Sequence, residues 1–132
     1  LGDGGAHVSS ISDASFPTYL LTHWARDRKR GEGLPLEWLV KQQTRDTAEL
    51  VGLRDRGLLA PGLRADVNVI DFDALRVLRP EMQYDLPAGG KRLVQRADGY
   101  RMTFVAGEVI QQDGETTGAL PGELVRGARE AG

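Results

Sequence analysis

The chain has 132 residues, of which 40% are hydrophobic and 27% are charged, and its formal net charge is −2. This composition is typical of a folded domain and excludes a disordered chain. The near balance of charges gives no broad attraction for nucleic acid or anionic lipid, and no apolar run reaches the roughly 20 residues of a transmembrane helix. Cysteine is absent, which excludes disulfides and thiolate metal sites in this segment and is compatible with the cytoplasm, where we expect the protein.

The first eight residues, LGDGGAHV, place Asp3 and His7 among three glycines. Glycine lets the backbone approach a metal ion or a ligand without a Cβ atom in the way. Taken alone, the Asp-Gly-Gly sequence also fits a common turn, and His7 fits a structural hydrogen-bonding group beside a loop. The rest of the chain must therefore decide whether these two residues belong to a functional site.

Helical spacing of apolar residues predicts a first helix over residues 15–30 that ends at Gly31. Phe16, Leu20 and Trp24 stand four residues apart, and His23 extends the same face. We therefore interpret Trp24 as a core residue and His23 as a packing residue rather than a ligand. A cluster of cations at the end of the helix is interpreted as solvated: Arg26, Arg28, Lys29 and Arg30.

A second helix is predicted over residues 35–51, with Pro35 in its first turn and Gly52 as its stop. Apolar residues follow at spacings of three and four, and Trp38 beside them is interpreted as a core residue. The Thr44 hydroxyl can accept a backbone N–H at the start of a separate short helix. We therefore expect a kink or a break at Thr44.

Strands and turns are predicted beyond Gly52. After a turn at Pro61-Gly62, residues 65–71 predict a half-buried strand with Val67 and Val69 on its inner face. Three further strands are predicted at residues 91–96, 100–106 and 108–112, with turns at residues 106–107 and 113–114. Residues 74–90 contain two prolines and weak periodicity, which predicts an extended connection across the surface.

Two helices followed by about four strands predict an α+β fold. The sequence alone does not show how such a sheet would cover both of its faces, and a segment of a larger fold would have the same pattern. The lack of an initiating methionine and the glycine-rich start favour a segment of a larger protein.

Three stretches carry a resemblance to a known family: GDGGAH, TRDTAELVGLRDRGLLAPGLRADVNVIDFD and YRMTFVAGEVIQQDGETTGALPGELVRG. Together they resemble the C-terminal part of the amidohydrolase superfamily, and they are most similar to the N-acyl-D-amino-acid deacylases, or D-aminoacylases. The most specific element is the helix end before Gly52, followed by Gly57, Pro61-Gly62, Ala65-Asp66 and a valine-rich strand. In that family, this stretch leads from the last barrel helix into a small β-sandwich.

The resemblance implies an α+β fragment with two parts. Residues 1–52 would be the C-terminal end of a (β/α)8 TIM-like barrel, with the strand-eight loop and two helices, and residues 53–132 the C-terminal portion of a composite β-sandwich domain. Asp3 would be the strand-eight aspartate at the catalytic rim, contacting zinc and accepting the proton of the attacking water. The resemblance makes His7 a candidate for substrate binding.

A catalytic zinc site takes three or more ligands, and this chain supplies at most Asp3 and His7. We therefore expect zinc in the full-length parent and none bound by this segment alone. The parent is expected to hydrolyse the amide bond of N-acyl-D-amino acids, a class of small-molecule substrate, and to bind neither nucleic acid nor membrane. The segment alone is expected to be inactive and to self-associate through apolar helix faces.

Two alternatives stay open at this point. Hydantoinases, dihydroorotases and related cyclic-amide hydrolases share the barrel and the return to a sandwich, so the substrate could be a cyclic amide. A non-catalytic, β-rich interaction domain with two packing helices would also fit the predicted elements.

Overall fold

The computed structural model describes residues 13–128, so Asp3 and His7 lie outside the described residues. The chain divides into two units, one formed by residues 1–33 and 72–99 and the other by residues 34–71 and 100–132. Neither unit coincides with the predicted domains 1–52 and 53–132, and the barrel and sandwich assignments stay predictions. Within residues 13–128, no helix combines the length and the apolar character needed to cross a bilayer.

The first unit begins with a helical segment close to the predicted one. A 3-10 turn at Asp13–Ser15 leads into α1 (Phe16–Tyr19) and then into a π-helical stretch, Leu20–Asp27. The helix ends three residues before the predicted end because Arg28 takes an extended conformation. Thr18, Leu21 and Thr22 are the buried residues, whereas Phe16 is 45% exposed.

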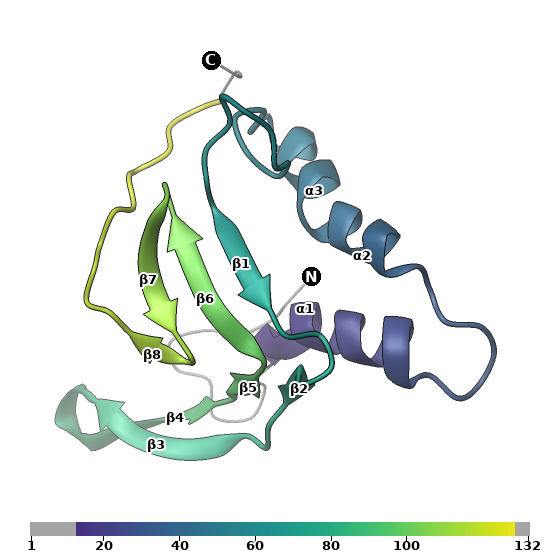
Figure 1. Ribbon diagram of the computed structural model, residues 1–132. Coiled ribbons are helices and arrows are strands. Elements are labelled where there is room, and N and C mark those ends of the chain that lie inside the picture. Colours follow the sequence, from purple (N-terminus) through teal and green to yellow (C-terminus); the bar gives the residue numbers. More distant parts are fainter. Residues whose placement is uncertain (1–12, 129–132) are drawn as a thin grey trace. The chain divides into compact units, whose positions relative to one another are not determined.

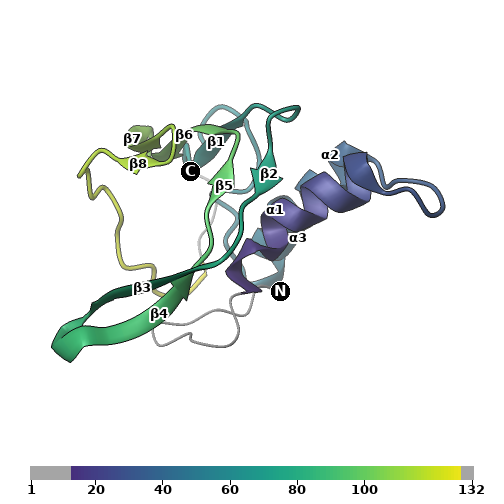
Figure 2. The same ribbon diagram turned by 90° about the horizontal axis from the view of Figure 1, so that it is seen from below.

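Strands of the first unit fill the stretch that was predicted as an extended connection, and that prediction is wrong. β2 (Arg76–Val77) pairs with β5 (Ala97–Asp98), and β3 (Glu81–Leu86) pairs with β4 (Gly90–Val94), both antiparallel. The β3–β4 pair forms a long twisted hairpin (Figure 2). Pro80 directly precedes β3 and Pro87 directly follows it, so the two prolines delimit this strand instead of interrupting it.

Helices α2 (Leu36–Gln43) and α3 (Arg45–Leu50) belong to the second unit, and the predicted break at Thr44 between them is confirmed. The predicted cap is wrong, because the Thr44 hydroxyl donates a hydrogen bond to the Val40 carbonyl at 2.8 Å instead of accepting one. The backbone carbonyl of Thr44 accepts the Ala48 N–H at 2.9 Å. Thr44 therefore joins the two helices through its backbone, while its own conformation (φ −119°, ψ −87°) breaks them.

The break also changes which side chains of the second unit are buried. Leu39 is 1% exposed and Ala48 is buried, whereas Trp38 is 49% exposed and Leu50 is 85% exposed. The predictions that Trp38 is a core residue and that the apolar stripe continues to Leu50 are therefore wrong. An apolar stripe of constant spacing requires one continuous helix. The irregular dihedral angles of Thr44 divide this helix in two, so the stripe does not continue beyond Thr44.

The end of α3 has the geometry of a Schellman motif. The Leu53 N–H donates to the Ala48 carbonyl at 2.8 Å, and the Gly52 N–H donates to the Glu49 carbonyl at 3.0 Å. Gly52 has φ +77°, a conformation that glycine adopts without steric cost. The predicted stop at Gly52 is thus confirmed.

The sheet of the second unit has the order β1-β6-β7-β8 (Figure 1). Its antiparallel strands are β1 (Val67–Ile70), β6 (Tyr100–Val105), β7 (Glu108–Gln112) and β8 (Glu115–Thr116). Both predicted hairpin turns are confirmed: Ala106-Gly107 and Asp113-Gly114 each have positive φ at both positions, as type I′ turns require. The β1–β6 register shifts between Val69 and Ile70, and Val69 is 45% exposed, so its predicted inward position is wrong.

Candidate functional site

The predicted catalytic and substrate-binding residues, Asp3 and His7, precede the first described residue, Asp13. Among residues 13–128, no three His, Cys, Asp or Glu side chains come together in a way that could hold a metal ion. The described residues therefore do not fit a zinc centre, and we assign no catalytic step to a metal there. They do show three polar or aromatic clusters that define the geometry of each unit.

The first cluster, in the first unit, surrounds His23. Its ring stacks on Tyr19 with a centroid distance of 5.0 Å and meets the edge of Trp24 at 5.4 Å. On the same helical segment, Tyr19 lies four residues before His23, and Trp24 directly follows His23. These ring contacts agree with the packing role that was predicted for His23.

The second cluster is centred on the guanidinium of Arg26 at the end of the same helix. Its nitrogens make five hydrogen bonds, which matches the five N–H donors of an arginine. Two go to the carboxylate of Asp27, at 2.8 and 3.0 Å. Three go to backbone carbonyls: those of Phe72, of Asp73 at 3.3 Å and of Leu75 at 2.8 Å. The guanidinium carbon also lies 5.4 Å from the centroid of the Phe72 ring.

This Arg26 clasp, defined as Arg26 with its acceptors, ties the end of the helix to the loop that leads into β2. The hydrogen bond with Asp27 is the main reason that the pKa of Arg26 is raised and the pKa of Asp27 is lowered. Leu75, whose carbonyl the clasp holds, is completely buried. The prediction that Arg26 is a solvated residue is therefore wrong. A sequence gives little signal for this role, because the acceptors are backbone carbonyls about 50 residues away.

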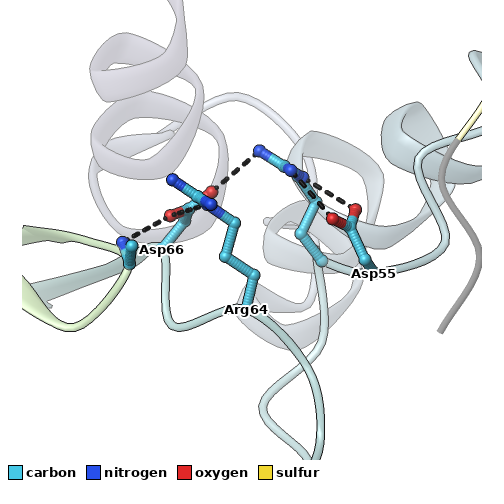
Figure 3. Close-up of polar contacts among 5 residues, drawn as sticks. Asp55, Arg64 and Asp66 are labelled. Atoms are coloured by element: carbon cyan, nitrogen blue, oxygen red, sulfur yellow. Dashed lines mark hydrogen bonds and ion pairs between the residues drawn. The ribbon is translucent and has the colours of Figure 1, made fainter. Parts of the chain in front are cut away.

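The third cluster, in the second unit, is centred on the carboxylate of Asp66 (Figure 3). Arg56 Nη1 donates to Asp66 Oδ2 at 3.1 Å, and Arg64 Nε donates to Asp66 Oδ1 at 3.0 Å. The backbone N–H of Ala106 donates to Oδ1 at 2.9 Å. Arg56 also pairs with both oxygens of Asp55, each at 2.9 Å, and this hydrogen bonding is the main reason that its pKa is raised.

This Asp66 clasp, defined as Asp66 with Arg56, Arg64 and Ala106, joins the loop after α3 to the turn between β6 and β7. A backbone hydrogen bond of 2.9 Å from the Gly107 N–H to the Ala65 carbonyl supports the same junction. Ala106 has φ +52°, so the carboxylate holds a turn residue in a conformation that is unfavourable for alanine. With both carboxylate oxygens engaged, the arrangement suits positioning of the turn better than proton transfer.

The sequence motif around Ala65-Asp66 had been recognised only as part of the family resemblance, and the role of Asp66 was missed. The signal that could have found it is an aspartate just before a strand, with arginines two and ten residues earlier. The I′ turn that it contacts lies 40 residues further along the chain, and sequence spacing does not predict that approach.

A family model described as "Amidohydrolase family" matches residues 1–111. The dihydroorotase of Lactobacillus johnsonii is 28% identical over 115 residues, which cover 84% of this chain and 26% of that protein. Adenine deaminase 2 of Rhizobium meliloti is 44% identical over 50 residues, which cover 35% of this chain and 8% of that protein. The chain thus spans about a quarter or less of these relatives, and no solved structure matches it.

The family model covers most of the chain, and the region it matches includes both the GDGGAH segment and the Asp66 clasp. The superfamily part of the predicted resemblance is confirmed, whereas these two relatives are not D-aminoacylases by name. On the strength of the match over residues 1–111, this chain belongs to the amidohydrolase family.

Proposed function

We propose that this chain is the C-terminal part of a hydrolase that cleaves carbon–nitrogen bonds, and that its substrate is an N-acyl-D-amino acid, cleaved to a carboxylate and a free D-amino acid. The observation that carries the proposal is the family match over residues 1–111, which reaches Asp3. The names of the two relatives, dihydroorotase and adenine deaminase, support this reaction class. The choice of N-acyl-D-amino acids depends on the resemblance of GDGGAH and of the tail after residue 112 to the deacylases.

Asp3 is the residue to which we assign the proton transfers. Its carboxylate accepts a proton from the attacking water while the oxygen bonds to the amide carbon, and it then gives that proton to the departing amine. The flanking glycines allow substrate to approach the backbone closely. His7 would orient Asp3 or bind the substrate. The zinc that the resemblance implies would take its other ligands from outside the described residues, which offer no group of three.

The proposed architecture follows the same resemblance. Residues 1–52 would close the barrel, and residues 53–132 would supply part of a β-sandwich. The helix stop at Gly52 lies at the proposed boundary, whereas α2 and α3 belong to the same compact unit as the four-stranded sheet. A solved structure of the full-length protein would test the arrangement directly.

A second candidate function is hydrolysis of a cyclic amide. It is favoured by one specific observation: the similarity to the dihydroorotase extends over 84% of this chain, whereas the similarity to the adenine deaminase covers 35%. Both candidates use the same reaction class and the same role for Asp3, so they differ in substrate alone.

The test is a turnover assay of the full-length protein with N-acetyl-D-amino acids, dihydroorotate and adenine. We expect release of free D-amino acid, and we expect Asp3→Asn to lower kcat by about 10²- to 10⁴-fold, the usual effect of losing a general base. Asp85→Asn is the matched control, because Asp85 is exposed and pairs with Arg92 in the β3–β4 hairpin. Its kcat should equal that of the wild type.

The other outcomes of this assay separate the alternatives. Turnover of dihydroorotate without any release of D-amino acids would favour the cyclic-amide candidate. No turnover of any substrate would favour the non-catalytic interaction domain. The 132-residue chain by itself should be inactive, and turnover by it that Asp3→Ala abolishes would contradict that expectation.

We also propose that the isolated chain self-associates with a second copy through apolar helix faces. Trp38 is 49% exposed on α2, and Leu50 and Val51 at the end of α3 are 85% and 65% exposed. Trp38→Glu combined with Leu50→Glu should lower the sedimentation coefficient to that of a monomer. Tyr84→Glu, a change at a 70% exposed residue of β3, is the matched control. An isolated wild-type chain that sediments as a monomer would contradict the proposal.

A further inference from the structure

A surface hollow lies at the end of the first helix, in a part of the first unit that the proposed reaction does not use. Its volume is about 460 Å³, and it is lined by two aromatic rings, one acid and three consecutive cations: His23, Trp24, Asp27, Arg28, Lys29 and Arg30. Three of these residues belong to the last turns of the helical stretch Leu20–Asp27, and the three cations belong to the loop that follows it. The hollow is therefore built by one short segment.

The lining of this hollow carries a net positive charge. Asp27 is the acid in its lining, and its carboxylate is already engaged by both Nε and Nη2 of Arg26. Within residues 13–128, no carboxylate lies within ion-pair distance of Arg28, Lys29 or Arg30. The hollow thus gathers three cations that have no ion-pair partner within residues 13–128.

Seven other arginines of the chain show the opposite pattern. Ion pairs with aspartate or glutamate engage Arg26, Arg45, Arg56, Arg64, Arg76, Arg92 and Arg101. The overall net charge is −2, so acids are not scarce in this sequence. Exposed cations outside these pairs also occur elsewhere in the described part of the chain, for example Arg79 and Lys91. The distinguishing property of residues 28–30 is that three cations line one hollow, and a bound anion would use it.

Arg28 is held in place before any ligand arrives. Its Nε donates to the Arg30 carbonyl at 2.7 Å, and its guanidinium carbon lies 4.5 Å from the centroid of the Trp24 ring. Cations beyond a helix C-terminus can also serve the helix dipole. Here the Arg28 guanidinium instead contacts the Arg30 carbonyl and the Trp24 ring, outside the helix that ends at Asp27. Within the described part of the chain, no acceptor engages the two terminal amino groups of Arg28, so both can bind a ligand.

We propose that this hollow binds a small, multiply charged anion of the phosphate class. A guanidinium presents paired N–H donors that match phosphate oxygens, and Lys29 and Arg30 add two exposed charges that can move toward such a ligand. The chain carries no net positive charge that would attract a long polyanion, which favours a small anion over nucleic acid. This site is independent of Asp3 and of the proposed reaction.

The test is calorimetric titration of the full-length protein with inorganic pyrophosphate. We expect saturable binding, and we expect the double variant Lys29→Ala/Arg30→Ala to weaken it at least about tenfold, because charge-assisted hydrogen bonds are lost. The matched control is Arg79→Ala/Lys91→Ala, which removes two exposed cations of the same unit from outside the hollow. Binding by the control should equal that of the wild type. Far-ultraviolet circular dichroism of each variant checks that the fold is kept.

Several outcomes would overturn the proposal. The absence of saturable pyrophosphate binding by the wild type would do so, as would equal weakening by the control variant, which would indicate a general charge effect. Binding that survives the Lys29→Ala/Arg30→Ala change would place the anion elsewhere, for example at a catalytic metal. Tighter binding of a mixed-sequence single-stranded RNA through the same two residues would assign the hollow to nucleic acid.

Discussion

The Arg26 clasp and the Asp66 clasp use the same two functional groups in opposite senses. In the first unit a guanidinium is surrounded by acceptors, and three of these are backbone carbonyls of one loop. In the second unit a carboxylate is surrounded by donors, and one of these is a backbone N–H. Arg26 therefore fixes the loop backbone itself, whereas Asp66 mainly gathers other side chains.

The comparison matters because each unit buries few apolar side chains. Leu21 and Leu75 are the buried apolar residues of the first unit, and Leu39 and Ala48 those of the second, among the described residues. With so small an apolar contribution, polar contacts that join distant parts of the chain carry more of the stability. We expect the clasp that holds more backbone groups to matter more. The following predictions test that order.

The largest effects should come from the two completely or almost completely buried leucines. Leu75 is 0% exposed and Leu39 is 1% exposed, and truncation of such residues to alanine costs about 2–5 kcal/mol through lost burial and the cavity that remains. Urea unfolding of Leu75→Ala and Leu39→Ala measures the cost. Leu120→Ala is the control, because Leu120 is 93% exposed and its truncation should leave the unfolding midpoint unchanged. Equal midpoints for all three variants would show that neither leucine supports a core.

The next largest effect should come from Arg26→Ala. It leaves the carbonyls of Phe72, Asp73 and Leu75 without this donor, and those of Phe72 and Leu75 are part-buried. The loss of these charge-assisted hydrogen bonds costs about 2–3 kcal/mol. Hydrogen exchange of the amides in β2 and β5 should accelerate, because the loop before β2 loses its anchor.

Two further variants separate the carbonyl contacts from the ion pair with Asp27. Asp27→Asn removes a charge but leaves the three carbonyl contacts, so its effect should be much smaller than that of Arg26→Ala. Arg92→Ala serves as the matched control, because in the described part of the chain the Arg92 side chain donates to the Asp85 carboxylate and to no carbonyl. A cost for Asp27→Asn as large as that for Arg26→Ala would mean that the ion pair, and not the loop anchor, is the stabilising contact.

A smaller effect is expected for Asp66→Asn. The amide keeps one oxygen acceptor for the Ala106 N–H but loses the charge that attracts Arg56 and Arg64, and Arg56 retains its pair with Asp55. We expect a cost of about 1 kcal/mol for Asn and somewhat more for Asp66→Ala. The amides of Ala106 and Gly107 should exchange faster. Asp113→Asn, at the other I′ turn, is the control. If it changes exchange at Ala106 equally, the Asp66 clasp is not specific.

The sequence predicted local features well and long-range polar contacts poorly, for a physical reason. The helix stop at Gly52 and both I′ turns depend on residues that are adjacent in the chain, so glycine and its neighbours were sufficient to predict them. The Thr44 break was likewise predicted, but the atom that makes its hydrogen bond was not. Backbone N–H and C=O groups carry no side-chain signal, which is why the three carbonyl contacts of Arg26 and the Ala106 N–H contact of Asp66 were missed.

The β3–β4 hairpin shows a second limit of sequence-based prediction, which concerns the position of prolines relative to strand ends. Pro80 and Pro87 lowered the predicted strand content of residues 74–90, yet they lie just outside β3, where they disturb no ladder bond. Sequence position alone could not show which side of a strand boundary each proline occupies. Asp3, by contrast, was found through its resemblance to a family motif, and its role stays a prediction because it lies outside the described residues.

The smallest expected effect is on the pH dependence of stability, and it differs between the acids of two ion pairs. These acids are Asp27, which pairs with Arg26, and Asp85, which pairs with Arg92. The hydrogen bond from the arginine lowers the pKa of each acid in the folded protein. A lowered folded-state pKa contributes stability above the ordinary aspartate pKa of about 3.9, and that contribution is lost as the pH falls through the folded-state value. Thermal unfolding between about pH 5 and pH 2 should therefore show a shallower acid loss of Tm in Asp27→Asn and in Asp85→Asn than in the wild type.

The two acids should nevertheless differ in the size of this change. Arg26 is already held by three carbonyls, so its pair with Asp27 needs little further ordering. Within residues 13–128, by contrast, the side-chain hydrogen bonds of Arg92 go to Asp85 alone. Ordering two mobile side chains offsets most of the gain from an exposed ion pair. We therefore expect Asp27→Asn to flatten the acid profile more than Asp85→Asn does. The reverse order, or profiles that superimpose on the wild type, would mean that the anchoring of Arg26 gives its ion pair no advantage.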